Sequence, residues 1–289
     1  MNCVLELKNI GFTYGKGTPF EKRAVDDVSL RIEQGEFIGV IGHTGSGKST
    51  LMQMLNGLMR PTDGQVLLDG RDIWAEPKKI RGVRFRVGLV FQYPEYQLFE
   101  ETVYKDIAFG PQNKGLDEAA VDKAVRAAAD FTGLKPALLN KSPFDLSGGE
   151  KRRAAIAGVI AMNPEVLVLD EPTAGLDPMG REVLLSQIVR YHKERHNTVL
   201  LVTHSMEDVA RVADRILVMN KGRLAMLAPV REVFRRGDEL EKLGLRVPQI
   251  TRIMQELRRR DFDVPEGVLT VDEAFDSLLP LLKKEGKLW

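Results

Sequence analysis

The chain has 289 residues, of which 43% are hydrophobic, and its 42 basic and 41 acidic residues leave a formal net charge of +1. This balance excludes a chain-wide electrostatic attraction to nucleic acid, and no apolar stretch approaches the roughly 20 residues that cross a bilayer. A single cysteine, Cys3, excludes an internal disulfide and fits a reducing cytosol, and the first residues do not have the form of a signal peptide. We expect one large globular domain, or a domain with an extension.

The first forty residues alternate apolar and polar side chains in two runs, around 4–7 and 28–32, on either side of a loop with Gly15, Gly17 and Pro19. Such alternation predicts strands that bury one face. Residues 65–73 contain a further hairpin pattern around Gly70. The sequence therefore predicts a small antiparallel sheet at the N-terminus.

A glycine-rich segment follows a short apolar strand at 36–41 and precedes a helical pattern at 49–58. It fits G-x-x-x-x-G-K-[ST], a loop whose backbone N–H groups wrap a polyphosphate. The loop residues predicted to bind the nucleotide are Gly42, His43, Thr44, Gly45, Ser46, Gly47, Lys48, Ser49 and Thr50. In this motif the lysine meets the β- and γ-phosphates and the serine hydroxyl is offered to Mg²⁺.

After a strand at 87–91, strand patterns vanish between 102 and 161 and helical patterns replace them. Strands then alternate with helices from 166 to 219, which is typical of a parallel sheet with helices on its faces. We therefore expect a P-loop (RecA-like) α/β core that carries an inserted helical subdomain at about 93–163.

Two carboxylates end the apolar strand that begins at residue 166. Asp170 is placed to hold Mg²⁺ directly or through water. Glu171 points to the other side of the strand, because side chains alternate along it, and can polarise an attacking water. Guanine-binding proteins commonly carry Asn-Lys-x-Asp. The Asn-Lys pairs at 113, 140 and 220 lack that aspartate, so adenine is the better expectation.

The last fifty residues form two amphipathic patterns. The first places Ile250, Ile253, Met254 and Leu257 on one helix face. The second begins at 270–273 with a capping-box sequence and contains Pro280, which is expected to kink or end it. The predicted organisation is an ATP-binding domain at 1–238 and a C-terminal helical extension at 239–289.

Five motifs in order resemble those of an ABC-type ATPase domain over about residues 4–230. They are the loop at 42–49, Leu-Ser-Gly-Gly-Glu at 146–150, the strand end at 167–172, Gly-Leu-Asp-Pro at 175–178, and Thr-His at 203–204. In that family the segment at 146–150 reaches the nucleotide of a partner subunit. The resemblance implies that Ser147 and Gly149 contact ATP bound at Lys48 of a second chain. The usual family residue at position 150 is glutamine, and this chain has Glu150.

The resemblance also implies roles for single residues. Glu171 is the general base, and His204 holds the γ-phosphate and the catalytic water. Gln92 touches Mg²⁺ or the water and senses a membrane partner. Asp177 lies in the loop that crosses the interface, and Tyr14 stacks on adenine.

Within the family, segments 17–26, 42–45 and 91–99 and the C-terminal helices look most like ATPase subunits of energy-coupling factor transporters. That resemblance implies a second ATPase chain, copy or paralogue, a transmembrane coupling protein and a membrane protein that captures a vitamin or transition-metal ion. It places the chain peripherally on the cytoplasmic face of the cell membrane. The aromatic residues Tyr93, Tyr96 and Phe99 either receive the membrane partner or fill the local core.

Two other kinds of function stay open as alternatives. A soluble ABC ATPase of translation or DNA repair carries two ATPase domains, or separates the two glycine motifs by a long coiled coil, and this chain has neither feature. A nucleotide-binding regulator without turnover conflicts with the presence of both Glu171 and His204.

Overall fold

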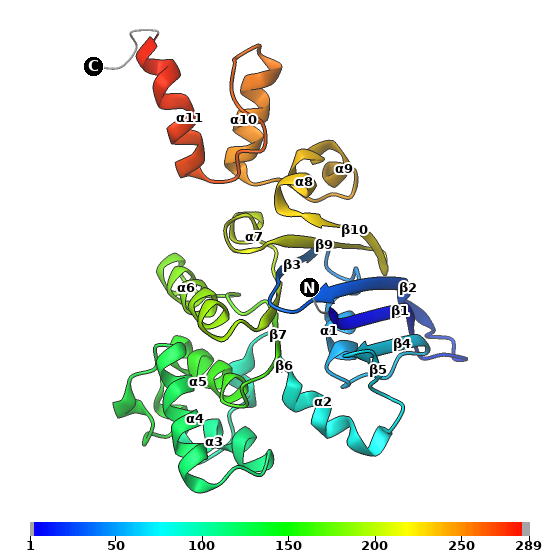
Figure 1. Cartoon of the computed structure of the whole chain (residues 1–289), viewed down its shortest axis with the longest axis vertical. Helices are drawn as coiled ribbons and strands as arrows, with labels where there is room; N and C mark the ends of the chain where they lie inside the picture. Colours follow the sequence, from blue (N-terminus) through cyan, green and yellow to red (C-terminus); the bar gives the residue numbers. More distant parts are fainter. Residues whose placement is uncertain (1–2, 285–289) are drawn as a thin grey trace.

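The computed structural model describes residues 3–284, and its centre is a six-stranded sheet with the order β10-β9-β3-β8-β7-β6 (Figure 1). The strands are β3 (Phe37–Gly42), β6 (Val87–Val90), β7 (Val166–Asp170), β8 (Thr198–Val202), β9 (Arg215–Asn220) and β10 (Arg223–Pro229). All neighbouring pairs are parallel except the edge pair β9 and β10. Most of these parallel strands are buried along their whole length, as strands covered on both faces are. The predicted α/β core is confirmed.

A second sheet with the order β2-β1-β4-β5 is antiparallel throughout. Its strands are β1 (Cys3–Tyr14), β2 (Lys22–Glu33), β4 (Asp63–Leu68) and β5 (Arg71–Asp72). Helix α1 (Lys48–Leu55) buries Leu51, Met52, Met54 and Leu55 in one cluster with residues of both sheets. This shared core fixes the N-terminal sheet against the phosphate loop, because the same helix starts at that loop.

The remaining helices of the core flank the parallel sheet. They are α2 (Ile80–Arg86), α6 (Pro178–Arg195) and α7 (Met206–Val212), with the 3₁₀ turn η1 (Pro77–Lys79) before α2. The parallel strands end at the same edge of the sheet. The loops after β3, β7 and β8 therefore carry their side chains to one place, as open α/β sheets do for ligands.

The inserted helical subdomain lies at one end of the molecule (Figure 1). It contains η2 (Pro94–Gln97), α3 (Val103–Asn113), α4 (Glu118–Phe131), η3 (Pro136–Leu138), η4 (Pro143–Asp145) and α5 (Gly148–Ile160). Thr102 and Asp117 cap α3 and α4 by accepting backbone N–H groups. Its core is continuous with α6 through Leu184, Ile188 and Tyr191.

The C-terminal helices are α8 (Val230–Arg235), α9 (Gly237–Lys242), α10 (Gln249–Arg259) and α11 (Val271–Lys284). The expected boundary at 238/239 falls inside α9. Leu240, Leu245 and Val247 pack in one cluster with Ile41 of β3. A separate small cluster begins at Met254 and joins α10 to α11, and these two helices stand at the opposite end of the molecule from α3 and α4 (Figure 1).

Pro280 was expected to kink or end the last helix, and it does not end it, because α11 continues to Lys284. Pro280 is exposed, so the carbonyl that loses its N–H partner can be hydrated and the helix loses only one hydrogen bond. Within residues 3–284, none of the helices is long and apolar enough to cross a membrane.

Candidate nucleotide site

The phosphate loop joins β3 to α1 and needs glycine at its two tightest points. At Gly47, with φ +97°, a Cβ would lie 2.4 Å from the carbonyl oxygen of Ala24, and at Gly42, with φ +154°, 2.3 Å from that of Met219. No side chain caps the N-terminus of α1. Its first N–H groups are therefore open to an anion, which the helix dipole also favours.

Lys48 lies beneath this loop with only 6% of its surface exposed. Its Nζ donates to the carbonyl oxygens of Gly42, at 2.7 Å, and His43, at 2.9 Å. Burial lowers the pKa of the Lys48 ammonium, and the charges of Glu171 and Asp170 act in the opposite direction. The loop thus holds a pre-oriented cation next to two carboxylates.

Glu171 follows the last residue of β7 in the left-handed backbone region, with φ +51°. A non-glycine residue pays roughly 1–3 kcal/mol for this conformation, and here the Glu171 N–H donates to the Val202 carbonyl at 3.0 Å. Its carboxylate is held from two sides, since Gln92 Nε2 lies 3.2 Å from Oε2 and His204 Nε2 lies 2.7 Å from Oε1. Three residues predicted to act together therefore meet at one carboxylate.

Asp170, the last residue of β7, is buried with 8% exposure. Burial raises the pKa of its carboxyl group, while a hydrogen bond with the Ser49 hydroxyl lowers it. Asp170 and Ser49 thus meet at the start of α1, as predicted for a pair that shares a metal ion.

A cavity of about 410 Å³ opens over the phosphate loop. The predicted residues that line it are Tyr14, Thr44, Gly45, Gly47, Lys48, Ser49, Thr50, Gln92, Glu171 and His204. The Tyr14 hydroxyl lies 3.1 Å from the Thr50 hydroxyl, and the ring is 43% exposed. Gly42, His43 and Ser46 shape the loop without lining this cavity.

Lys22 and Ala24 also line the cavity, and our sequence reasoning did not include them. Lys22 pairs with Tyr14 across β1 and β2. The antiparallel hairpin predicted around the loop at 15–19 could have indicated Lys22, because a residue that pairs with Tyr14 in such a hairpin lies at the same edge of the sheet.

The His43 side chain is exposed, and it has a neighbour that the sequence did not suggest. Its Nε2 contacts the carbonyl oxygen of Leu243, just after α9. The next residue, Gly244, has φ +67°, and a Cβ there would lie 2.7 Å from the imidazole ring. The segment after α9 thus rests directly on the phosphate loop.

The second glycine segment starts α5 and lies outside the cavity. Ser147 is the N-cap of α5, and Ser147 and Glu150 form a reciprocal capping box. Glu150 Oε2 accepts from the Ser147 N–H at 2.9 Å and from its hydroxyl at 2.7 Å, and these bonds lower the pKa of the Glu150 carboxyl. A glutamine can close the same box, so the departure from the family residue leaves this helix start intact.

Ser147 and Asp177 are exposed, Gly149 is partly exposed, and all three lie on loops or helix starts. The Asp177 carboxylate caps α6 by accepting the Gly180 N–H at 2.6 Å. A Cβ on Gly149 would meet no atom within 4 Å. The space in front of the second glycine segment is therefore open in a single chain.

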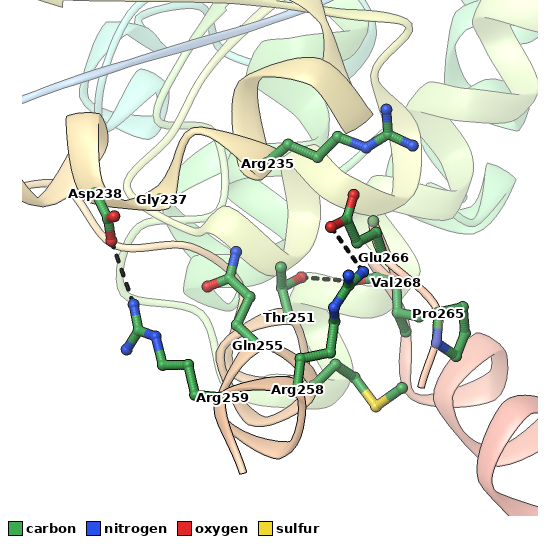
Figure 2. A pocket seen from close by; sticks show the side chains of 12 residues that line it. Arg235, Gly237, Asp238, Thr251, Gln255, Arg258, Arg259, Pro265, Glu266 and Val268 are labelled. Carbon is green, nitrogen blue, oxygen red and sulfur yellow. Dashed lines mark hydrogen bonds and ion pairs between the residues drawn. The ribbon is translucent and has the colours of Figure 1, made fainter. Parts of the chain in front are cut away.

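Another cavity, of about 290 Å³, lies among residues 235–268 at the base of the C-terminal helices (Figure 2). Two of its arginines are paired within the chain: Arg258 lies 2.7 Å from Glu266, and Arg259 lies 3.3 Å from Asp238 (Figure 2). These ion pairs join α10 to its surroundings, and the cavity shares no residue with the one over the phosphate loop.

The fold and the site together define an ATP-binding cassette. A family model described as "ABC transporter" matches residues 25–174. A dimeric ATP-binding cassette in a post-hydrolysis state, bound to ADP and phosphate, superposes with a TM-score of 0.70 at 27% identity, over 78% of this chain and 98% of that one.

More similar relatives narrow the class. The energy-coupling factor transporter ATP-binding protein EcfA2 of Caldanaerobacter subterraneus subsp. tengcongensis is 51% identical over 96% of this chain and 98% of its own. The EcfA2 protein of Clostridium perfringens is also 51% identical, over 98% and 99%. The structure of cbiO1 from Clostridium perfringens, part of the ABC transporter complex cbiONQ, has a TM-score of 0.74 at 38% identity and covers 88% of this chain and all of that one. The chain belongs to the ABC transporter family and, within it, to the ATP-binding subunits of energy-coupling factor transporters.

Proposed function

We propose that the chain binds ATP with Mg²⁺ over the phosphate loop and hydrolyses it with Glu171 as the general base. The observation that carries this proposal is the Glu171 carboxylate, held by Gln92 and His204 at the mouth of the cavity that Lys48 and Ser49 line. Adenine-nucleotide hydrolysis agrees with the family to which the chain belongs.

The residues around Ser49 fit a magnesium ion bound together with nucleotide phosphates. Mg²⁺ is usually held by one or two carboxylates plus phosphates rather than by an all-protein cage. Ser49 and Gln92 line the cavity and supply a hydroxyl and an amide oxygen, and Asp170, which hydrogen-bonds with Ser49 but does not line the cavity, supplies one carboxylate. Within residues 3–284, no group of three or more His, Cys, Asp and Glu side chains could form a cage of its own. When bound, the ion would neutralise charge that develops on the phosphates.

The side chains divide the hydrolytic step among them. Lys48 and the N–H groups at the start of α1 bind the phosphates. Glu171 accepts a proton from the water that attacks the γ-phosphate, and the imidazole of His204 keeps the carboxylate oriented and contacts that phosphate. Gln92 holds the second carboxylate oxygen, so that Glu171 keeps one direction before nucleotide arrives.

We further propose that the site is completed by a second ATPase chain. Ser147, Gly149 and Asp177 are accessible and do not line the cavity over their own phosphate loop. In a head-to-tail pair, the exposed start of α5 would present Ser147 and Gly149 to the ATP of the other chain. One of the similar structures is described as a dimeric cassette, which supports a pair of this kind.

The membrane partner is proposed to dock beside Gln92. Tyr93, Tyr96 and Phe99 are 42%, 84% and 59% exposed, which favours a docking surface over a role in the local core. The relatives are named as subunits of energy-coupling factor transporters. We infer a peripheral position on the cytoplasmic face of the membrane, under a coupling protein and a protein that captures a vitamin or transition-metal ion.

A dependence of turnover on pairing tests this function. The rate per chain is expected to rise with protein concentration, or on adding the second ATPase chain, and to rise again when the membrane components are added in lipid. Full turnover in a sample that light scattering shows to be monomeric would contradict the two-chain site. Turnover that membrane components leave unchanged would favour the alternative, a soluble ABC ATPase not coupled to transport.

Tyr14 is proposed to stack on adenine, and two substitutions separate its ring from its hydroxyl. Base–aromatic stacking is worth about 1–3 kcal/mol per base. Tyr14→Ala is therefore expected to weaken equilibrium ATP binding roughly 5- to 150-fold. Tyr14→Phe keeps the ring, loses the contacts of the hydroxyl with Thr50 and with the Met59 sulfur, and is expected to bind ATP nearly as the unmodified chain does. Equal affinities of the two variants would show that the ring makes no stacking contact.

A further inference from the structure

The guanidinium of Arg152, in the second turn of α5, joins three segments of the chain. Arg152 is 4% exposed. Its Nε lies 3.1 Å from Glu95 Oε2, and a terminal nitrogen lies 2.6 Å from Glu95 Oε1. Its other terminal nitrogen donates to the carbonyl oxygens of Pro172, at 3.3 Å, and Ala174. The same guanidinium lies 5.8 Å from the centre of the Tyr93 ring.

Each of these segments carries a different part of the proposed site. Glu95 lies three residues after Gln92, on the turn η2 beside the exposed aromatic surface. Pro172 and Ala174 lie one and three residues after Glu171 in the chain. Arg152 itself is on α5, and the start of this helix, at 147–149, does not line the chain's own cavity. One side chain of α5 therefore contacts both the turn after Gln92 and the loop after the proposed base.

The contact has the geometry that only arginine provides. A planar guanidinium binds a carboxylate with two parallel hydrogen bonds and still has N–H groups left for carbonyl oxygens. A lysine would keep the positive charge but would lose the pair of parallel N–H groups that binds both carboxylate oxygens. Because both ends of the pair are largely buried, at 5% and 16% side-chain exposure, the pair is weakly screened by solvent and fixes the relative position of its two segments.

We propose that Arg152 is a positioning residue that makes the start of α5 move together with Gln92 and Glu171. A shift of η2, such as a partner docking on Tyr93 and its neighbours would impose, is passed through Glu95 to Arg152. Through the same guanidinium, the shift also moves the loop that follows Glu171 and the start of α5, at 147–149. This inference rests on the proposed function, since it assumes that the start of α5 serves a partner's nucleotide.

Conservative substitutions at both ends of the pair test this role in the complete pair of ATPase chains. Glu95→Gln keeps the shape of the side chain and removes its negative charge. Arg152→Lys keeps the positive charge and removes the two parallel N–H groups that bind the carboxylate. For both variants we expect equilibrium ATP affinity within about twofold of the unmodified chain and a kcat at least tenfold lower. The double variant is expected to lose no more than the worse single variant, because residues that act through one contact are not additive.

A second ion pair, whose carboxylate is buried to a similar degree, provides the control. Arg215 lies 3.0 Å from Glu36, with side-chain exposures of 28% and 15%. This pair joins the beginnings of β9 and β3, at the edge of the sheet opposite the phosphate loop. Glu36→Gln is expected to leave both ATP affinity and kcat within twofold.

The outcomes separate this inference from the function on which it rests. If Glu95→Gln turns over ATP as fast as Glu36→Gln, the positioning role is overturned. It is also overturned if ATP affinity falls in step with kcat, because the pair would then only support the fold of the site. Gly149→Asp, measured in the same assay, tests the shared site itself. Normal turnover by Gly149→Asp contradicts the proposed function. If Gly149→Asp loses turnover while Glu95→Gln turns over ATP normally, only the positioning role of Arg152 is contradicted.

Discussion

Replacing Glu171 by glutamine is expected to leave ATP binding nearly unchanged and to slow hydrolysis about 10²–10⁴-fold, the usual contribution of a positioned general base. In the proposed site, binding depends on the loop at 42–50 and on Lys48, which donates to Gly42 and His43. The substitution touches none of these contacts. It removes only the group that we propose accepts the proton of the attacking water.

The surroundings of Glu171 can accommodate an amide of the same size. An amide has one oxygen that accepts and one NH2 that donates, so only the neighbour that meets the NH2 has to change: either Gln92 rotates its amide to present oxygen, or His204 takes the tautomer that accepts at Nε2. Both contacts that now hold the carboxylate, at 3.2 Å and 2.7 Å, can therefore be kept in a neutral form. For this reason we expect the variant to fold, to bind ATP and to hydrolyse it slowly.

An equilibrium-binding measurement beside a single-turnover assay checks this expectation. Glu165→Gln is the matched control, because Glu165 immediately precedes the other end of the same strand, β7, and pairs with Arg86 on the surface. The control is expected to bind and hydrolyse ATP at the unmodified rate. Near-normal single-turnover hydrolysis by Glu171→Gln would remove Glu171 from the role of base.

The sequence predicted the parts of the fold and the site that depend on local pattern. The strand, loop and helix around residues 36–58 follow from an apolar run, the positions of glycine and a helical period, and the structure confirms them with boundaries shifted by one to three residues. The Asp170–Glu171 pair was found for the same reason, since a buried strand that ends in two carboxylates is a local signal.

Contacts between distant segments could not be predicted in the same way. No local period relates His43 to Leu243 or Arg152 to Glu95, although both contacts lie beside the nucleotide site. Lys22 and Ala24 were missed because their place depends on strand register. The sequence did not decide whether the helix ends at Pro280, because propensity alone does not reveal that the freed carbonyl lies on an exposed face.

Gly149→Asp is expected to abolish turnover while this chain folds normally and binds ATP at its own Lys48. In the structure a Cβ at residue 149 would meet no atom within 4 Å, and the residue lies in the first turn of α5, where a carboxylate is favourable for the helix. Within a single chain the change is therefore well tolerated. In the proposed pair the new carboxylate would face the triphosphate of the partner, where like charges repel.

Labelling each chain with a photoreactive ATP analogue distinguishes the two half-sites. Lys48→Ala should remove labelling from this chain and leave the partner labelled, whereas Gly149→Asp should leave this chain labelled and weaken labelling of the partner. Gly148 offers a mild control, because a Cβ there also meets no atom within 4 Å, so Gly148→Ala should disturb folding little and adds no charge. If both glycine segments served the nucleotide of one chain, Gly149→Asp would weaken labelling of the chain that carries it. The location of the lost label therefore decides whether the segment at 146–150 acts within its own chain or across the pair.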